Sequence, residues 1–471
     1  MVAAERMSAV DRAWLLMERP TNPMTIVAVI VLGGRITRAR IRALVEERFA
    51  AFHRFRCRPV ANGLAASWVE ADPFDLDDHI LGAALPPPAG QAELEALVGE
   101  LAGTPFNSSR PWWTFHVVEH YGHGSAIIAR IHHCYADGIA LIRVLLGMAD
   151  GEHVPAMPPP QAQDTELASD GAFSLGSLYA PVASLIANTL REGAGLVEQT
   201  ARFGLDPKKV LDTAMGTAGV LGEIAHLGTL ADDPPTSLKR PLSGSRRVAW
   251  AAPLAFEEVR TIGHVLGCTV NDVLVATLAG ALGRYLEGEG ERTEGLTLHA
   301  AVPINLRREN EPSAALGNRF GLVFVELPVG IRHPLERLYA VHAAMKALKG
   351  SSEALVTLGL LAAVGALPPA VEQTAIETFT AKASLVASNV PGPPGEIRIA
   401  GVPVKQMLFW VPQAGSIGTG ISMLSYNGQV QFGVMSDRRL IPEPRKLVAL
   451  VETEFERLVL LVLLGGAALQ E

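Results

Sequence analysis

The chain has 471 residues, of which 49% are hydrophobic and 19% are charged. These values exclude an intrinsically disordered protein, because disordered chains are poor in apolar residues and rich in charge. The formal net charge is −8 at pH 7 and no basic stripe is present, which argues against nucleic acid as a partner. At roughly 100–200 residues per domain, the length predicts two to four domains.

The cysteines and the apolar segments indicate the compartment. Cys57, Cys134 and Cys268 are too few and too scattered for a disulfide framework or a CxxC metal site, which favours a reducing compartment. The charged residues near the N-terminus argue against a signal peptide. The longest apolar stretches, Ala354–Leu367 and Leu458–Leu464, are shorter than the roughly 20 residues of a membrane-spanning helix. We therefore expect a cytoplasmic protein in which these stretches are either core helices or contacts with a membrane or lipid-droplet surface.

The first 150 residues predict alternating strands and helices. Met24–Leu32 is continuously apolar and β-branched, which is typical of a strand buried on both faces. Thr37 can cap the helix that follows, because the apolar residues after it recur on one helical face. Trp113–Tyr121 and Ser125–His132 resemble strands and are joined by a Gly-His-Gly turn, so we expect a hairpin.

The proline-rich segment Gly151–Gly171 is the best linker candidate. Long helical patterns follow from Phe173 to Leu230, and the alternation of strands and helices resumes at Arg246. These features predict an N-terminal domain over residues 1–150, a linker with a helical segment over residues 151–241, and a C-terminal domain over residues 242–471.

Two adjacent histidines are the strongest candidates for chemistry. His132 and His133 end a predicted strand, and Asp137 begins the helical pattern that follows. Only one of the two histidines can face a given cavity, because neighbouring strand residues point to opposite faces. A histidine there is well placed as a general base, since its reference pKa of about 6.5 lets it accept a proton near neutral pH. The alternatives are a metal site, which the opposed directions disfavour, and a structural histidine beside a helix N-cap.

A second candidate lies in the other half of the chain. Thr269 is followed three residues later by Asp272, which predicts a capping box at the start of a helix. Asn271 would then lie in the first helical turn, where the macrodipole favours negative charge and its side-chain amide could donate to an oxyanion. The alternative is that Asn271 and Asp272 only initiate the helix.

The segment from His132 to Gly138 reads HHxxxDG, which resembles the signature of the CoA-dependent acyltransferase superfamily. That superfamily includes chloramphenicol acetyltransferase-like enzymes and peptide-synthetase condensation domains. Further segments resemble motifs of the bacterial wax ester synthase/diacylglycerol acyltransferases and extend over nearly the whole chain. They are Met7–Asp11, Asn22–Met24, Arg110–Trp113 (with Trp112 where that family has leucine), Asn271–Asp272, Leu316–Asn318 and Ser388–Pro393.

The resemblance implies an α/β fold of two chloramphenicol-acetyltransferase-like domains, with the active site in a tunnel between them. It implies His133 as the general base, with His132 as a supporting residue. Asp137, Gly138 and Asp272 would also be supporting residues, Asp137 by holding the shape of the loop and Gly138 by allowing a tight entry into the helix.

The resemblance also implies the reaction. We expect a long-chain O-acyltransferase that moves a fatty acyl group from acyl-CoA to diacylglycerol, a long-chain alcohol or both, giving triacylglycerol or wax ester. Acyl-CoA would be a co-substrate, with no bound cofactor and no metal. A thioester is already activated, so a base and an oxyanion donor such as Asn271 suffice. In agreement, no G-x-S-x-G nucleophile elbow is present.

Two other interpretations of the function remain open: a superfamily acyltransferase with a more polar acceptor, of the condensation type, and an inactive paralogue that binds lipid.

The sequence also gives two structural expectations. Arg307 would pair with Asp137, and Ser388–Pro393 would form a turn at the domain interface, because it contains Pro and Gly.

Overall fold

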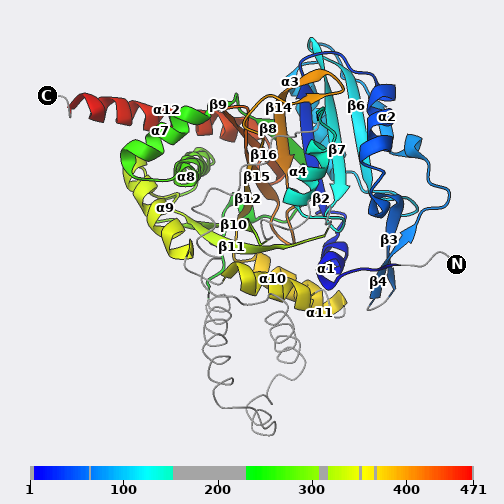
Figure 1. The fold of residues 1–471 in the computed structure, drawn as a ribbon. Helices are drawn as coiled ribbons and strands as arrows, with labels where there is room; N and C mark the ends of the chain where they lie inside the picture. The colour runs from blue at the N-terminus through cyan, green and yellow to red at the C-terminus, as the bar shows by residue number, and fades with distance from the viewer. Residues whose placement is uncertain are drawn as a thin grey trace, which may run out of the picture.

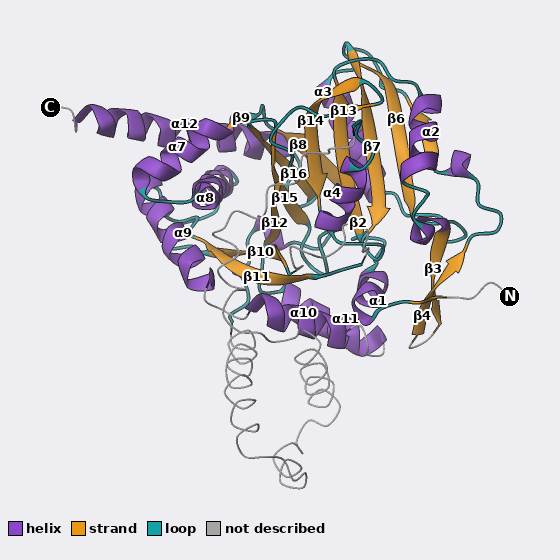
Figure 2. Ribbon diagram, viewed as in Figure 1, coloured by secondary structure: helices purple, strands orange, loops and turns teal. Residues whose placement is uncertain are grey.

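The computed structural model describes residues 5–62, 65–151, 230–306, 317–349, 353–364 and 369–468. The helices predicted between Phe173 and residue 229 lie outside the described residues, as do almost all of the predicted linker segment Gly151–Gly171 and Arg307. The described part is a mixed α/β fold built on two large sheets (Figures 1 and 2).

The first sheet has six strands in the order β13-β14-β2-β7-β6-β5. Their bounds are β2 Thr25–Leu32, β5 Ile80–Ala83, β6 Trp113–Tyr121, β7 Gly124–His132, β13 Arg398–Ile399 and β14 Val402–Trp410. The predicted hairpin is confirmed, because β6 and β7 pair antiparallel. The predicted buried strand is also confirmed, since every residue of β2 is buried.

Helices and a small sheet complete this half of the molecule. The helices are α1 Ala9–Met17, α2 Arg38–Arg48, α3 Gln91–Gly103 and α4 Gly138–Leu146, with 3-10 turns at His53–Arg56 and Leu76–Asp78. The small sheet consists of β1 Glu5–Arg6, β4 Ala65–Glu70 and β3 Cys57–Asn62. Thr37 caps α2 as predicted, since its hydroxyl accepts the Arg40 N–H at 3.4 Å.

The second sheet has the order β11-β10-β12-β15-β16-β8, with β9 also paired to β16. Its strands are β8 Arg246–Trp250, β9 Leu254–Ala255, β10 Leu298–Asn305, β11 Phe320–Leu327, β12 Leu385–Pro391, β15 Thr419–Tyr426 and β16 Gln429–Asp437. The accompanying helices are α7 Phe256–Leu266, α8 Val270–Gly288, α9 Pro334–Lys349, α10 Glu353–Val364, α11 Pro369–Thr380 and α12 Pro444–Ala468, with a 3-10 turn at Ser237–Lys239. The apolar core of this half lies between the sheet and α7, α8, α9 and α12.

The two halves exchange segments. Strand β14 comes late in the chain but pairs antiparallel with β2, so the first sheet contains strands from both ends of the sequence. In the opposite direction, α3 from the first half packs against β8 of the second sheet, and α1 packs against α10 and α11. The predicted domain boundaries at residues 150 and 242 stay a prediction. They do not anticipate that each half contributes segments to the other.

The two apolar stretches behave differently. In α10, the side chains of Val356 and Leu358 are 1% and 6% exposed, so this part of the first stretch is a core helix. In α12, Leu458 is fully buried, whereas Leu460, Leu463 and Leu464 are 56%, 64% and 68% exposed. Among the described helices, no single one is long and apolar enough to cross a membrane; α7 and α8 pass that test only as a pair, bent by 99°.

Candidate active site

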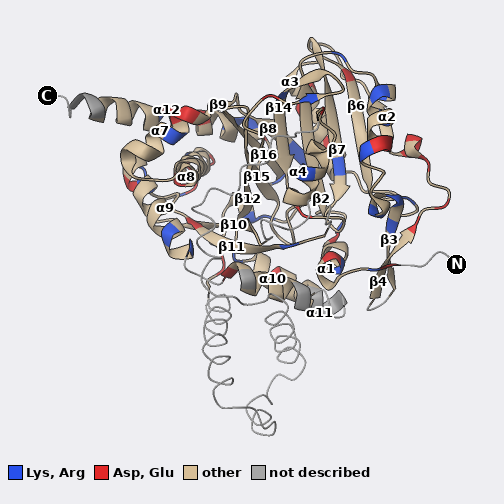
Figure 3. Ribbon diagram, viewed as in Figure 1, with Lys and Arg blue, Asp and Glu red and all other residues tan. Residues whose placement is uncertain are grey.

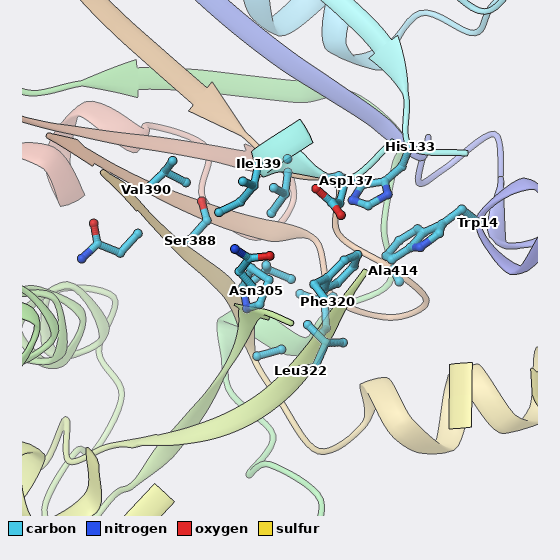
Figure 4. A pocket seen from close by; sticks show the side chains of 18 of the residues that line it. Trp14, His133, Asp137, Ile139, Asn305, Phe320, Leu322, Ser388, Val390 and Ala414 are labelled. Carbon is cyan, nitrogen blue, oxygen red and sulfur yellow. The ribbon is translucent and has the colours of Figure 1, made fainter. Parts of the chain in front are cut away.

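A pocket lies where the loop between β7 and α4 meets the second sheet (Figure 4). One wall contains Trp14 and the His133–Ile139 loop, and the opposite wall is formed by β10, β11 and β12. The space between the walls, with the solvent at its open mouth included, is about 870 Å³. Most of the lining side chains are apolar, among them Phe320, Leu322 and Val390. The pocket can therefore hold an apolar molecule beside His133.

His133 is held rigidly at this pocket. Its N–H donates to the Met24 carbonyl at 2.8 Å, and its own carbonyl accepts the Asn318 side-chain amide at 3.0 Å. The side chain is 2% exposed, and its Nδ1 has no hydrogen-bond partner among the described residues. Burial lowers the pKa of His133 to about 3, although the nearby Asp137 carboxylate acts in the opposite direction. The imidazole is therefore neutral at neutral pH, with a nitrogen lone pair available, and burial makes it a weaker base than a free histidine.

His132 points away from the pocket, as the alternation of strand residues predicts. Its Nδ1 accepts the Cys134 N–H at 3.1 Å, so the proton of the neutral ring is on Nε2. That Nε2 faces Oε2 of Glu18 at 3.3 Å. His132 thus has partners on both ring nitrogens and shapes the loop that carries His133.

Asp137 connects this loop to the second half of the chain. Its Oδ1 accepts the Ala140 N–H at 2.9 Å and caps α4, as the sequence predicts. Its Oδ2 accepts the Arg319 N–H at 2.9 Å, and its own N–H donates to the Gly317 carbonyl at 3.3 Å. The expected pairing with Arg307 falls outside the described residues.

Gly138 allows a tight entry into α4 through close packing rather than through an unusual backbone conformation. Its backbone is not in the left-handed region that favours glycine. Instead, a Cβ at this position would lie 3.0 Å from the Phe409 ring and 3.4 Å from Val411. The absence of a side chain lets α4 start directly against β14 and the residue that follows it.

The capping box at the start of α8 is confirmed. Oδ2 of Asp272 accepts the Thr269 N–H at 2.8 Å, and the Thr269 hydroxyl accepts the Asp272 N–H at 3.2 Å. Asn271, however, is not among the residues that line the pocket. Its Oδ1 accepts a hydrogen bond from the Asn389 side-chain amide at 2.5 Å, and Asn389 does line the pocket. The structure therefore connects Asn271 to the site through Asn389.

Trp14, Ser388 and Asn389 line the pocket but are not among the site residues predicted from the sequence. Ser388 and Asn389 belong to β12, whereas the sequence predicted a turn for this motif. The available signal was the pair of polar residues that follows the apolar start of a strand. Trp14 also lines the pocket, three residues after the Met7–Asp11 motif, but nothing in its spacing marks it as more than a core residue.

One group of side chains has the composition of a metal site. Ligand atoms of Cys268, Asp272 and His342 lie within 4.8 Å of one another. Asp272 already accepts hydrogen bonds from Thr269 and, at 2.8 Å, from Nδ1 of His342. A cation there would also face the positive end of the α8 macrodipole. These hydrogen bonds explain why Asp272 and His342 lie together at the start of α8.

Solved structures define the class of the fold. The wax ester synthase/diacylglycerol acyltransferase from Marinobacter aquaeolei is 21% identical, with a TM-score of 0.66 over 97% of this chain and 99% of that chain. The first condensation domain of the calcium-dependent antibiotic synthetase is 14% identical, with a TM-score of 0.59 over 98% and 96% of the two chains. The predicted two-domain, chloramphenicol-acetyltransferase-like α/β fold is therefore confirmed.

Sequence comparisons give the family. The wax ester synthase/diacylglycerol acyltransferase catalytic domain matches residues 7–274, and the WS/DGAT C-terminal domain matches residues 316–459. A Mycobacterium bovis protein provisionally named a diacylglycerol O-acyltransferase is 30% identical over 96% of this chain and 90% of its own length. A probable diacylglycerol O-acyltransferase of Mycobacterium tuberculosis is 29% identical over 86% and 84%. The chain belongs to the wax ester synthase/diacylglycerol acyltransferase family, as its motifs predict.

Proposed function

We propose that the protein transfers a long acyl chain from acyl-CoA to the hydroxyl of a diacylglycerol or a long-chain alcohol. The observation that carries this proposal is a neutral, buried imidazole, His133, at the wall of an apolar pocket. The diacylglycerol O-acyltransferase names of the curated relatives support the acceptor class.

In the proposed reaction, His133 takes the proton of the acceptor hydroxyl while the oxygen attacks the thioester carbonyl. The tetrahedral intermediate carries a negative charge on the former carbonyl oxygen. When it collapses, the carbon–sulfur bond breaks, and the departing CoA thiolate takes the proton from the imidazolium. The products are an ester and free CoA, and no covalent enzyme intermediate is required.

The oxyanion needs a hydrogen-bond donor; Asn389 lines the pocket, and its hydrogen bond to Oδ1 of Asn271 brings the amide of Asn271 next to it. Oδ1 of Asn271 accepts from Asn389, which leaves the amide hydrogens of Asn271 for another acceptor. Asn271 lies in the first turn of α8, where the macrodipole favours a developing negative charge. We assign the oxyanion role to this pair rather than to Asn271 alone.

The acceptors partition into lipid, so the protein must reach a lipid surface. The outer end of α12 extends beyond α7, and it carries no charged side chain from Leu458 onward (Figures 1 and 3). The three exposed leucines of α12, Leu460, Leu463 and Leu464, make this end an apolar surface. We propose it as the contact with a membrane or lipid droplet.

The decisive experiment offers purified protein palmitoyl-CoA with either hexadecanol or dioleoylglycerol, and quantifies ester and free CoA. We expect ester and CoA in equal amounts. His133→Ala should lower kcat at least about 100-fold, the lower limit for general base catalysis, whereas His132→Ala should lower it less. His116→Ala is the matched control, because His116 is also buried but lies away from the pocket. A folded His133→Ala protein at the wild-type rate would overturn the proposed mechanism.

A further inference from the structure

Helix α1 and the residue after it contact both histidines directly and reach His133 a second time through Asn318. Asp11 and Trp14 lie on α1, and Glu18 is its C-cap residue. Their proximity to the histidine motif is not evident from the sequence, because more than one hundred residues separate the two segments. The proposed reaction uses none of the three.

The indole of Trp14 stacks on the imidazole of His133, with ring centroids 4.0 Å apart and an interplanar angle of 25°. Phe320 contacts both rings, at 5.5 Å from His133 and 5.8 Å from Trp14. Two aromatic side chains from different halves of the chain therefore limit rotation of the imidazole. They also exclude water from the ring surfaces that they cover.

The backbone around the histidines is fixed from the same helix. Oδ1 of Asp11 accepts a hydrogen bond from the Asn318 amide at 2.8 Å, and the same amide donates to the His133 carbonyl. Oε2 of Glu18 accepts the Met24 N–H at 2.5 Å and faces Nε2 of His132. The loop is thus held on both sides of His133.

We propose that α1 positions the catalytic base. Trp14 fixes the plane of the His133 ring and excludes water from it, and Glu18 holds the loop through its contact with His132. This inference rests on the proposed function, since it assumes that His133 is the base. Trp14, Glu18 and Asp11 are positioning residues that act through the histidines.

The contact between Trp14 and His133 should affect how the rate depends on pH. The charged and titratable groups near His133 are Asp137 at the start of α4, His132 in the same loop, and Asp11, which reaches it through Asn318. Burial outweighs the favourable effect of Asp137 and lowers the pKa of His133. Removal of the indole would admit water, stabilise the imidazolium and raise this pKa toward its ordinary value of 6.5.

The first test compares Trp14→Ala and Trp14→Phe by kcat/KM from pH 4.5 to 9 with palmitoyl-CoA and hexadecanol. The wild type should show no loss of rate from His133 protonation in this range. Trp14→Ala should lose activity toward the acidic end of this range, because His133 becomes protonated more readily there. Its kcat should fall by up to about 10²-fold at pH 8, the cost of misplacing a reacting group by about 1 Å. Trp14→Phe keeps an aromatic wall and should restore most of the rate and the wild-type pH profile.

The control variants replace a second buried tryptophan, Trp250, which lies away from the pocket. Trp250 is also buried, and its Nε1 likewise has no partner among the described residues, but it does not line the pocket. Trp250→Ala and Trp250→Phe should leave the pH profile unchanged even where they lower stability. A shift of the profile in the Trp250 variants, or its absence in Trp14→Ala, would overturn the role of Trp14.

Glu18→Gln tests the second contact and should lower kcat at nearly constant KM. Its matched control is Glu93→Gln, because Glu93 also accepts a backbone N–H, that of Gly90 at 2.8 Å, at the start of α3. Equal rates for the two variants would overturn the role of Glu18. His133→Ala separates the two proposals: if it is fully active, the proposed function fails. If it is inactive while Trp14→Ala and Glu18→Gln behave as wild type, only the present inference fails.

Discussion

Replacing Asp137 by alanine should destabilise the protein as well as reduce its activity. The substitution removes the cap of α4, which costs about 0.5–2 kcal/mol, and leaves the Arg319 N–H without its carboxylate, which costs about 1–3 kcal/mol. We therefore expect the free energy of unfolding to fall by roughly 1.5–5 kcal/mol. Serine caps helices about as well as aspartate but is too short to reach both partners. Asp137→Ser should therefore recover about 1 kcal/mol of the loss.

Urea unfolding monitored by circular dichroism, with initial rates measured on the same preparations, checks this prediction. The expected order of unfolding midpoints is wild type, Asp137→Ser and Asp137→Ala. The rate should fall in parallel, because a loosened loop misplaces His133. An Asp137→Ala protein with the wild-type midpoint and no activity would refute the reasoning, since it would show that the carboxylate takes part in the chemistry.

Two further predictions concern the oxyanion and the lipid surface. Asn271→Ala and Asn389→Ala should each lower kcat by about 10²–10³-fold with little change in the unfolding midpoint, and the double variant should lose little more, because the two amides act as a unit. Additive losses, or full activity of either variant, would contradict this pairing. Replacing Leu460, Leu463 and Leu464 together by serine should abolish flotation with triolein-containing vesicles, whereas Val265→Ser on α7, where Val265 is 56% exposed, should not. Wild-type protein that stays wholly in the soluble fraction would remove this proposal.

The features that could be predicted from sequence are those set by local chemistry. The capping box at Thr269 and the N-cap at Asp137 depend on residues three positions apart, and strand alternation predicts that His132 and His133 diverge. The pairing of β14 with β2 has no local signal, because it joins segments almost 400 residues apart. Asn389 could not be predicted for the same reason, because its position in the pocket depends on the pairing of β12 with β10 and β15, which are distant in the sequence.

The exchange of segments also shapes one wall of the pocket. The loop between β14 and β15 passes from the first sheet to the second and lines the pocket with Ala414 and Ile417. Asn22 holds this loop, since its side-chain amide donates to the carbonyls of Gly415 at 3.1 Å and Ile417 at 2.9 Å. Separating the halves would break these bonds and pull β14 from the first sheet, which would disrupt many backbone hydrogen bonds at once. If the pocket binds the proposed substrates, we expect them to enter through its open mouth, past the wall that Asn22 holds.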